Sequence, residues 1–237
     1  MDHFTWVSWF ISHDYDHTIT ATLVIAALLV WAVIGRRQLQ AAADPVIPDA
    51  TLTARNSAEI FVEWFIDFSQ GILGPKARKY LTIYATFFLF ILAANLSGLL
   101  PGVSPPTSNF NITFALGVTS FVLYNFFAFQ QKGISYLKHF LGPIWWLAIL
   151  MLPLELIDNF VRPVSLALRL FGNMTGDHLV IGIFTDLTKL VIPVLFLTLG
   201  SFVSLIQAFV FTILSLVYLA LALEEHDAHG EHAEHHH

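Results

Sequence analysis

Long apolar segments separated by short polar ones make up most of the chain. A helix rises 1.5 Å per residue, so about 20 apolar residues cross a hydrocarbon core of about 30 Å. On this basis we predict an all-α, polytopic membrane protein with about five membrane helices, forming a single membrane domain over residues 1–237. The predicted membrane segments are 18–34, 80–100, 112–130, 143–184 and 191–223.

The last two segments, 143–184 and 191–223, are too long to cross a bilayer perpendicular to its plane. Excess helix length in a membrane is accommodated by tilt. We therefore expect these two segments to form a long, strongly tilted hairpin, with a polar turn at Thr185–Lys189 between them.

Residues 56–72 carry large apolar side chains at helical spacing, but three acids interrupt them. This pattern predicts an amphipathic helix, capped by Asn56 or Ser57, that lies at the membrane surface. An ordinary helix packed on its neighbours fits the same pattern equally well. The three acids are Glu59, Glu63 and Asp67.

Basic residues outside the spans indicate the orientation. Arg36 and Arg37 follow the first span, and Lys132 and Lys138 follow the third, so these ends are expected in the cytoplasm. The N-terminus is then periplasmic, and the His- and acid-rich tail 224–237 is cytoplasmic. The first residues lack the basic start of a signal peptide and the Arg- and Ser-rich pattern of a transit peptide. A bacterial inner membrane is the simplest location.

The composition agrees with a membrane protein. Charged residues are 12% of the 237 residues, whereas soluble domains carry about 25%. Cysteine is absent, which excludes disulfides and thiolate metal sites. We expect no cofactor, no metal and no nucleic-acid partner. The His-rich tail is interpreted as a solvated low-complexity end, with a metal site as the alternative. A haem would need paired intramembrane histidines, and His178 is the one histidine well inside a predicted span.

A polar stripe runs through the segment 143–184. Its members are separated by three or four positions, so they share one face of a helix. A charged stripe on an otherwise apolar membrane helix faces protein or water rather than lipid. The stripe consists of Glu155, Asp158, Arg162, Ser165, Arg169, Asn173 and Asp177.

Arg169 is the most informative residue of this stripe. Its guanidinium stays charged at any accessible pH, and a charge at the bilayer centre costs at least about 2.5–3.5 kcal/mol. No acid lies three or four positions away, so we expect its counter-charge on another subunit.

The acids of the stripe lie on both sides of Arg169 along the segment. Glu155 and Asp158 lie toward the cytoplasmic end, and Asp177 and His178 toward the outside. This order suggests two half-channels separated by a positive charge. Gln207 is the clearly polar side chain near the middle of the last segment.

Two structural explanations compete with this interpretation. Asp158 and Arg162 are four positions apart and also fit an ordinary intrahelical ion pair. Asn173 and Gln207 also fit a hydrogen bond that joins two membrane helices. His178 alone is weak support for proton handling, although the pKa range of histidine suits that role.

The string Pro163–Asn173, with Glu155 before it and Ser204-Leu-Ile-Gln207-Ala-Phe-Val-Phe after it, resembles the subunit a family of F-type ATP synthases. Asn95-Leu-Ser-Gly-Leu-Leu-Pro101 resembles the same family. The likeness covers nearly all of the chain from the linker before residue 56 onward. The Phe-Gly pair after Arg169-Leu is more similar to bacterial than to mitochondrial members.

The resemblance implies a non-catalytic stator subunit beside a rotating ring of c subunits, with b-type peripheral stalk subunits as further partners. Arg169 matches the arginine that faces the proton-carrying carboxylate of the ring. Asn173 and Gln207 match polar residues beside it, and Glu155 matches an acid of the cytoplasmic half-channel. His178 falls in the outer half-channel.

Two positions depart from the family pattern. Gly200 stands where some relatives have a histidine that pairs with the position of His178, and Asp177 is an additional acid. Protons are the expected ion, with sodium as the alternative. The rival function is a free-standing secondary transporter or ion channel, which polar residues in mid-span also suit. No internal repeat supports that rival.

Overall fold

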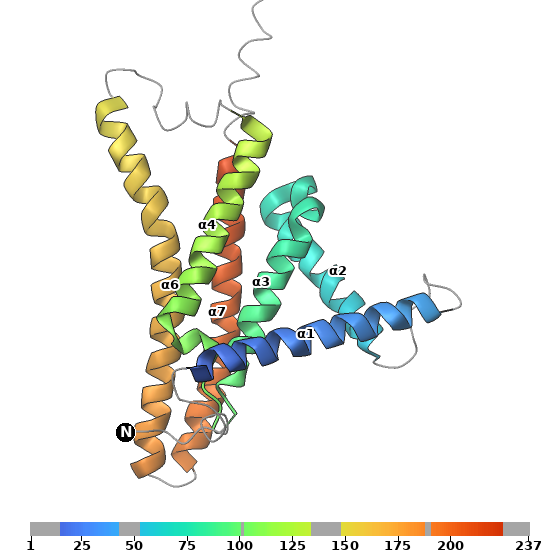
Figure 1. The fold of residues 1–237 in the computed structure, drawn as a ribbon, viewed down its shortest axis with the longest axis vertical. Coiled ribbons are helices and arrows are strands. Elements are labelled where there is room, and N and C mark those ends of the chain that lie inside the picture. Colours follow the sequence, from blue (N-terminus) through green and yellow to red (C-terminus); the bar gives the residue numbers. More distant parts are fainter. Residues whose placement is uncertain (1–14, 43–52, 101, 134–147, 188–190, 225–237) are drawn as a thin grey trace, which may run out of the picture.

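The structure is a computed structural model that describes residues 15–42, 53–100, 102–133, 148–187 and 191–224. The side chains of 148–152, 155, 156, 185–187, 191–193 and 224 lie outside this description, and so does the predicted tail 225–237. The described residues form helices joined by turns, without a strand (Figure 1). The elements are α1 (Asp16–Ala41), α2 (Ala54–Leu73), η2 (Gly74–Lys76), α3 (Ala77–Ser97), η3 (Pro106–Ser108), α4 (Phe110–Lys132), α6 (Ala148–Leu187) and α7 (Val191–Glu224).

The predicted fold class is confirmed. Four helical stretches among the described residues are long and apolar enough to cross a membrane: Asp16–Ala41, Ala54–Ser97, Phe110–Lys132 and Val194–Leu223. Helix α6 is the longest of the described helices and is not among these four stretches; it carries the charged stripe. Many large apolar side chains are exposed on these helices, including Leu29 of α1 and Leu195 of α7. Such surfaces suit lipid rather than water.

Two predicted boundaries were wrong. Helix α6 continues to Leu187, so the polar turn does not begin at Thr185. Helix α2 is capped by Thr53, not by Asn56 or Ser57, because the Thr53 hydroxyl accepts a hydrogen bond from the Asn56 backbone N–H at 3.2 Å. A hydroxyl at this place satisfies one of the free N–H groups of the first helical turn.

The last two helices are longer than the thickness of a bilayer core. Helix α6 has 40 residues and α7 has 34, which correspond to about 60 Å and about 51 Å. Both exceed a hydrocarbon core of about 30 Å. Helix α1, with 26 residues, crosses their direction at a steep angle (Figure 1). The strong tilt of the α6–α7 hairpin in the membrane stays a prediction.

Helix α2 packs against its neighbours and also carries an acidic surface. Its N-terminal end contacts α1, where Trp31 Nε1 donates to Ser57 Oγ at 3.2 Å. Trp64 lies edge-on to Phe209 of α7, with the ring centroids 5.4 Å apart. Glu63 and its neighbour one turn later, Asp67, are exposed. The packing is therefore that of an ordinary helix, and the position of α2 at the membrane surface stays a prediction.

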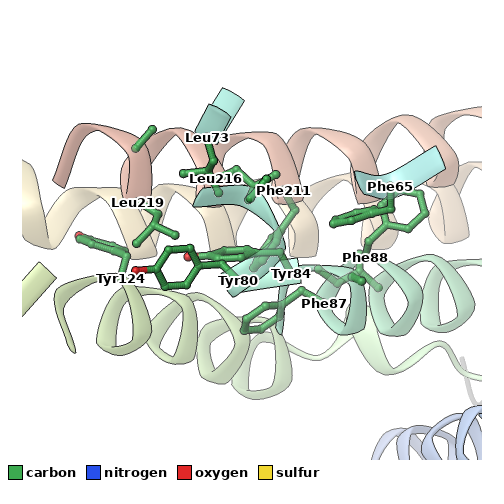
Figure 2. Close-up of a cluster of buried hydrophobic side chains, with 14 of the residues drawn as sticks. Phe65, Leu73, Tyr80, Tyr84, Phe87, Phe88, Tyr124, Phe211, Leu216 and Leu219 are labelled. Atoms are coloured by element: carbon green, nitrogen blue, oxygen red, sulfur yellow. The ribbon is translucent and has the colours of Figure 1, made fainter. Parts of the chain in front are cut away.

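The core lies where α2, α3, α4 and α7 meet. Aromatic rings fill it, with Phe65 from α2, Tyr84 from α3, Tyr124 from α4 and Phe211 from α7 all almost completely buried (Figure 2). Buried aromatic rings contribute large contact areas and favourable edge-to-face geometry. This cluster packs against one side of α7, and another side of α7 lies beside α6.

Helix α6 packs against α4. The two backbones come close at Gly117 of α4, where an added Cβ atom would lie 2.6 Å from the carbonyl oxygen of Pro163. A glycine is required here because no side chain fits between the two backbones. The inner face of α6 is thereby fixed, and the face with the polar stripe is turned toward α7 and outward.

Candidate functional site

The inner face of α6 is apolar and completely buried. Pro163, Leu166, Leu170 and Met174 lie on this face at helical spacing and pack within the bundle. Arg169 precedes Leu170 by one position, so it points about 100° away from the packed face. The Arg169 side chain is exposed. The amphipathic pattern of α6 thus places this cation outside the apolar core.

Three members of the polar stripe, Arg162, Asn173 and Asp177, lie against α7. We call the stretch of α6 from Arg162 to Asp177 the α6–α7 seam. Arg162 lies over the ring of Tyr218, with 5.1 Å between the guanidinium carbon and the ring centroid. Asn173 Nδ2 donates to Gln207 Oε1 at 2.7 Å.

Farther along α6, Asp177 faces the backbone of α7 at Gly200. The Asp177 Oδ2 atom lies 3.8 Å from the position of a Cβ atom added at Gly200. A Cβ atom at Gly200 would thus be in ordinary van der Waals contact with this carboxylate. The structure brings together two residues that the sequence singled out separately.

The register of the seam gives the level of Arg169 along α7. The helices are antiparallel, with Arg162 opposite Tyr218 and Asn173 opposite Gln207. Arg169 lies between these contacts and falls about level with Phe211. No acidic side chain among the described residues pairs with Arg169. The expectation that its counter-charge lies on another subunit stays a prediction.

The structural explanation for Asp158 and Arg162 is confirmed. Arg162 Nη2 lies 2.5 Å from Asp158 Oδ2, one helical turn away. Asp158 is the more exposed partner, at 59%, and Arg162 is exposed by 27%. Arg162 thus has an anion on its outer side and an aromatic ring of α7 on its inner side. The two arginines of α6 therefore differ sharply in their surroundings.

The hydrogen bond between Asn173 and Gln207 is also confirmed. Gln207 is 4% exposed, and its Nε2 has no hydrogen-bond partner among the described residues. A buried amide N–H without a partner is costly. Gln207 lines a narrow crevice together with Asn95, Asn173 and Asp177.

The remaining predicted site residues lie on α6. Asp177 and His178 are half-buried and lie on the C-terminal side of Arg169 in α6. Glu155 belongs to α6 by its backbone, but its side chain lies outside the described part. No group of three or more His, Cys, Asp or Glu side chains that could hold a metal ion occurs within the described residues.

Sequence analysis did not assign a role to Asn95. This residue of α3 is 1% exposed, its Nδ2 donates to the Ser204 carbonyl oxygen at 3.3 Å, and its Oδ1 accepts from Thr107 at 2.7 Å. It therefore ties the loop between α3 and α4 to α7, one turn from Gln207. The signal in the sequence was a lone amide near the end of an apolar span.

Together these features define a class of protein: a multi-pass helical membrane protein with a polar seam between two overlong helices, on which Arg169 has no acidic partner among the described side chains. Comparisons with known proteins agree with this class. The family model described as ATP synthase A chain matches residues 18–220. The chain therefore belongs to the ATP synthase A chain family.

Individual relatives match almost the full chain. A protein of Bdellovibrio bacteriovorus named ATP synthase subunit a is 38% identical over 214 residues, which cover 90% of this chain and 93% of the relative. ATP synthase subunit a of Trichlorobacter lovleyi is 42% identical over 202 residues, covering 85% and 84%. ATP synthase subunit a 1 of Syntrophotalea carbinolica is 41% identical over 209 residues, covering 88% and 86%.

Proposed function

We propose that this chain is the proton-translocating, non-catalytic stator subunit of a rotary F-type ATP synthase in a bacterial inner membrane. In this role Arg169 meets a carboxylate carried by a ring of c subunits. The observation that carries the proposal is the exposure of Arg169 on the α6–α7 seam without an acidic partner among the described side chains. The names of the relatives point to the same complex.

The electrostatics of Arg169 explain how it would control proton transfer. Two unit charges about 4 Å apart attract by about 4 kcal/mol at an effective dielectric constant near 20. Beside Arg169 a ring carboxylate is therefore stable in its ionised form and releases its proton. Once the carboxylate turns into lipid, desolvation makes the protonated form the favourable one. A loaded carboxylate thus does not pass Arg169, and protons travel by rotation of the ring.

The two ends of the polar stripe would supply the two half-channels. Glu155 serves the cytoplasmic side, and Asp177 and His178 serve the outer side, with the N-terminus periplasmic and the C-terminus cytoplasmic. Asn173 lies between Arg169 and the outer acids along α6, and it is hydrogen-bonded to Gln207 of α7. The b-type peripheral stalk subunits would hold this chain against rotation. Each proton contributes about 2.3 kcal/mol per 100 mV of membrane potential.

The test replaces Arg169 in the complete complex. Arg169→Ala is expected to leave the complex assembled but to abolish ATP synthesis driven by a proton gradient in vesicles. Arg169→Lys is expected to impair synthesis as well, because the ammonium lacks the planar fork of the guanidinium and has a different reach. Full synthesis by assembled Arg169→Ala would refute the proposal. Proton transport by the purified chain without c subunits would favour a free-standing transporter instead.

A further inference from the structure

Helix α6 carries a second arginine on the same stripe as Arg169. Arg162 precedes it by seven residues, which is about 10.5 Å along the axis and nearly the same direction around it. These two are the only Lys or Arg residues of α6 and α7. Both therefore lie along the line where, in the proposed function, an ionised carboxylate moves past α6. Two equivalent cations would give that carboxylate two binding places along α6.

The surroundings of Arg162 remove this equivalence. Its Nη2 lies 2.5 Å from Asp158 Oδ2, and its guanidinium carbon lies 5.1 Å from the ring centroid of Tyr218 on α7. Asp158 is twice as exposed as Arg162, 59% against 27%, so the carboxylate is on the outer side of the pair. Arg169 is exposed and has no such carboxylate among the described side chains.

We propose that Asp158 and Tyr218 form a positioning site that keeps Arg162 electrically neutralised against α7, so that Arg169 remains the one cation on the seam that captures the ring carboxylate. This inference rests on the proposed function. It makes Asp158 a fixed counter-ion and not a carrier of protons. An ion pair of this kind presents little net charge to a passing carboxylate, whereas a lone guanidinium attracts it strongly.

Removing the counter-ion creates a specific defect. In Asp158→Asn the guanidinium of Arg162 loses its neutralising charge and becomes a second binding place about 10.5 Å from Arg169. An ionised ring carboxylate then leaves more slowly, and each step of the ring is delayed. Removing the arginine as well, in Asp158→Asn with Arg162→Gln, abolishes the second binding place. The double variant is therefore expected to be faster than Asp158→Asn alone.

The experiment measures proton-driven ATP synthesis by the complete complex in vesicles, per assembled complex, for the two single variants and the double variant. We expect Asp158→Asn to lose at least about tenfold, equivalent to about 1.4 kcal/mol in the barrier. Arg162→Gln and the double variant are expected to stay within about threefold of the parent. Asp158→Glu keeps the charge and is the matched control, expected near the parental rate.

Several results would overturn the inference. One is a double variant as slow as Asp158→Asn, which is what a merely structural ion pair or a proton-carrying Asp158 produces. Another is an Asp158→Asn variant at the parental rate. If Asp158→Asn fails to assemble, Arg162→Gln alone decides, because loss of an already neutralised cation must leave at least a third of the parental synthesis. Arg169→Ala is measured in parallel: its activity tests the proposed function separately from the role of Asp158.

Discussion

The close approach of α4 to α6 at Gly117 gives a quantitative prediction. In Gly117→Ala the new Cβ atom of α4 would lie 2.6 Å from the carbonyl oxygen of Pro163 in α6. Ordinary C···O contacts begin near about 3.3 Å, so the two helices must separate by about 0.7 Å. The carbonyl belongs to the backbone and cannot rotate away. The displaced residue directly follows Arg162, so the shift also reaches the α6–α7 seam.

The expected cost follows from two opposing terms. Overpacking of this kind costs about 1–3 kcal/mol, and alanine in place of glycine inside a helix returns about 0.5–1 kcal/mol. The net loss in the free energy of unfolding lies between about 0 and 2.5 kcal/mol, with a central value of about 1.25 kcal/mol. For a chain of this size the central value corresponds to a decrease in Tm of about 2.5–5 °C.

The assay is thermal unfolding of the purified protein in detergent, with Gly71→Ala as the matched control. Gly71 lies in α2, where an added Cβ atom meets nothing within 4 Å. Only the favourable helical term applies there, so Gly71→Ala is expected to keep or raise Tm by about 1–4 °C. If Gly117→Ala proves as stable as Gly71→Ala, the argument that the α4–α6 contact depends on a glycine is refuted.

Two further predictions concern buried polar contacts. Ser120 Oγ donates to Ser215 Oγ at 2.9 Å between α4 and α7. Ser120→Ala leaves a buried hydroxyl without its partner and should cost about 1–3 kcal/mol, whereas Ser120→Ala with Ser215→Ala should cost much less; equal losses of Tm in the single and double variants would contradict this. Asn95→Ala removes the acceptor of Thr107 and should cost a similar amount. Its Tm should recover partly when Thr107→Val is added, and a further decrease would contradict the proposed tie.

The fold class was predictable because length and hydropathy are local properties of the chain. Runs of apolar residues give α1, α3, α4 and α7 directly, since a lipid-exposed backbone must satisfy its own hydrogen bonds within a helix. Errors occurred at the ends. The cap of α2 lies at Thr53, because the hydroxyl that reaches the first free N–H decides the start and several polar residues there were equivalent in the sequence. The end of α6 was also missed, because the polar residues Thr185 and Asp186 indicated a turn where the helix continues to Leu187.

The candidate site was predictable in part. Spacing of three and four residues placed Arg169, Asn173 and Asp177 on one face of α6, and this periodicity is a property of any helix. The partners on α7 were not predictable in this way. Spacing along α6 does not tell which residue of α7 stands opposite, so the contact of Arg162 with Tyr218 required the register of the hairpin.

By itself the sequence determined that this protein is an all-helical membrane protein with a charged stripe on one overlong helix, and its motifs indicated the family. Only the tertiary structure decided which charges of that stripe are compensated. Arg162 and Arg169 are the same residue type in similar apolar sequence. One has a carboxylate at 2.5 Å and an aromatic ring of α7, and the other is exposed on the seam. The physical reason is that the field at a charge depends on distances to groups on other turns and helices, and folding sets those distances.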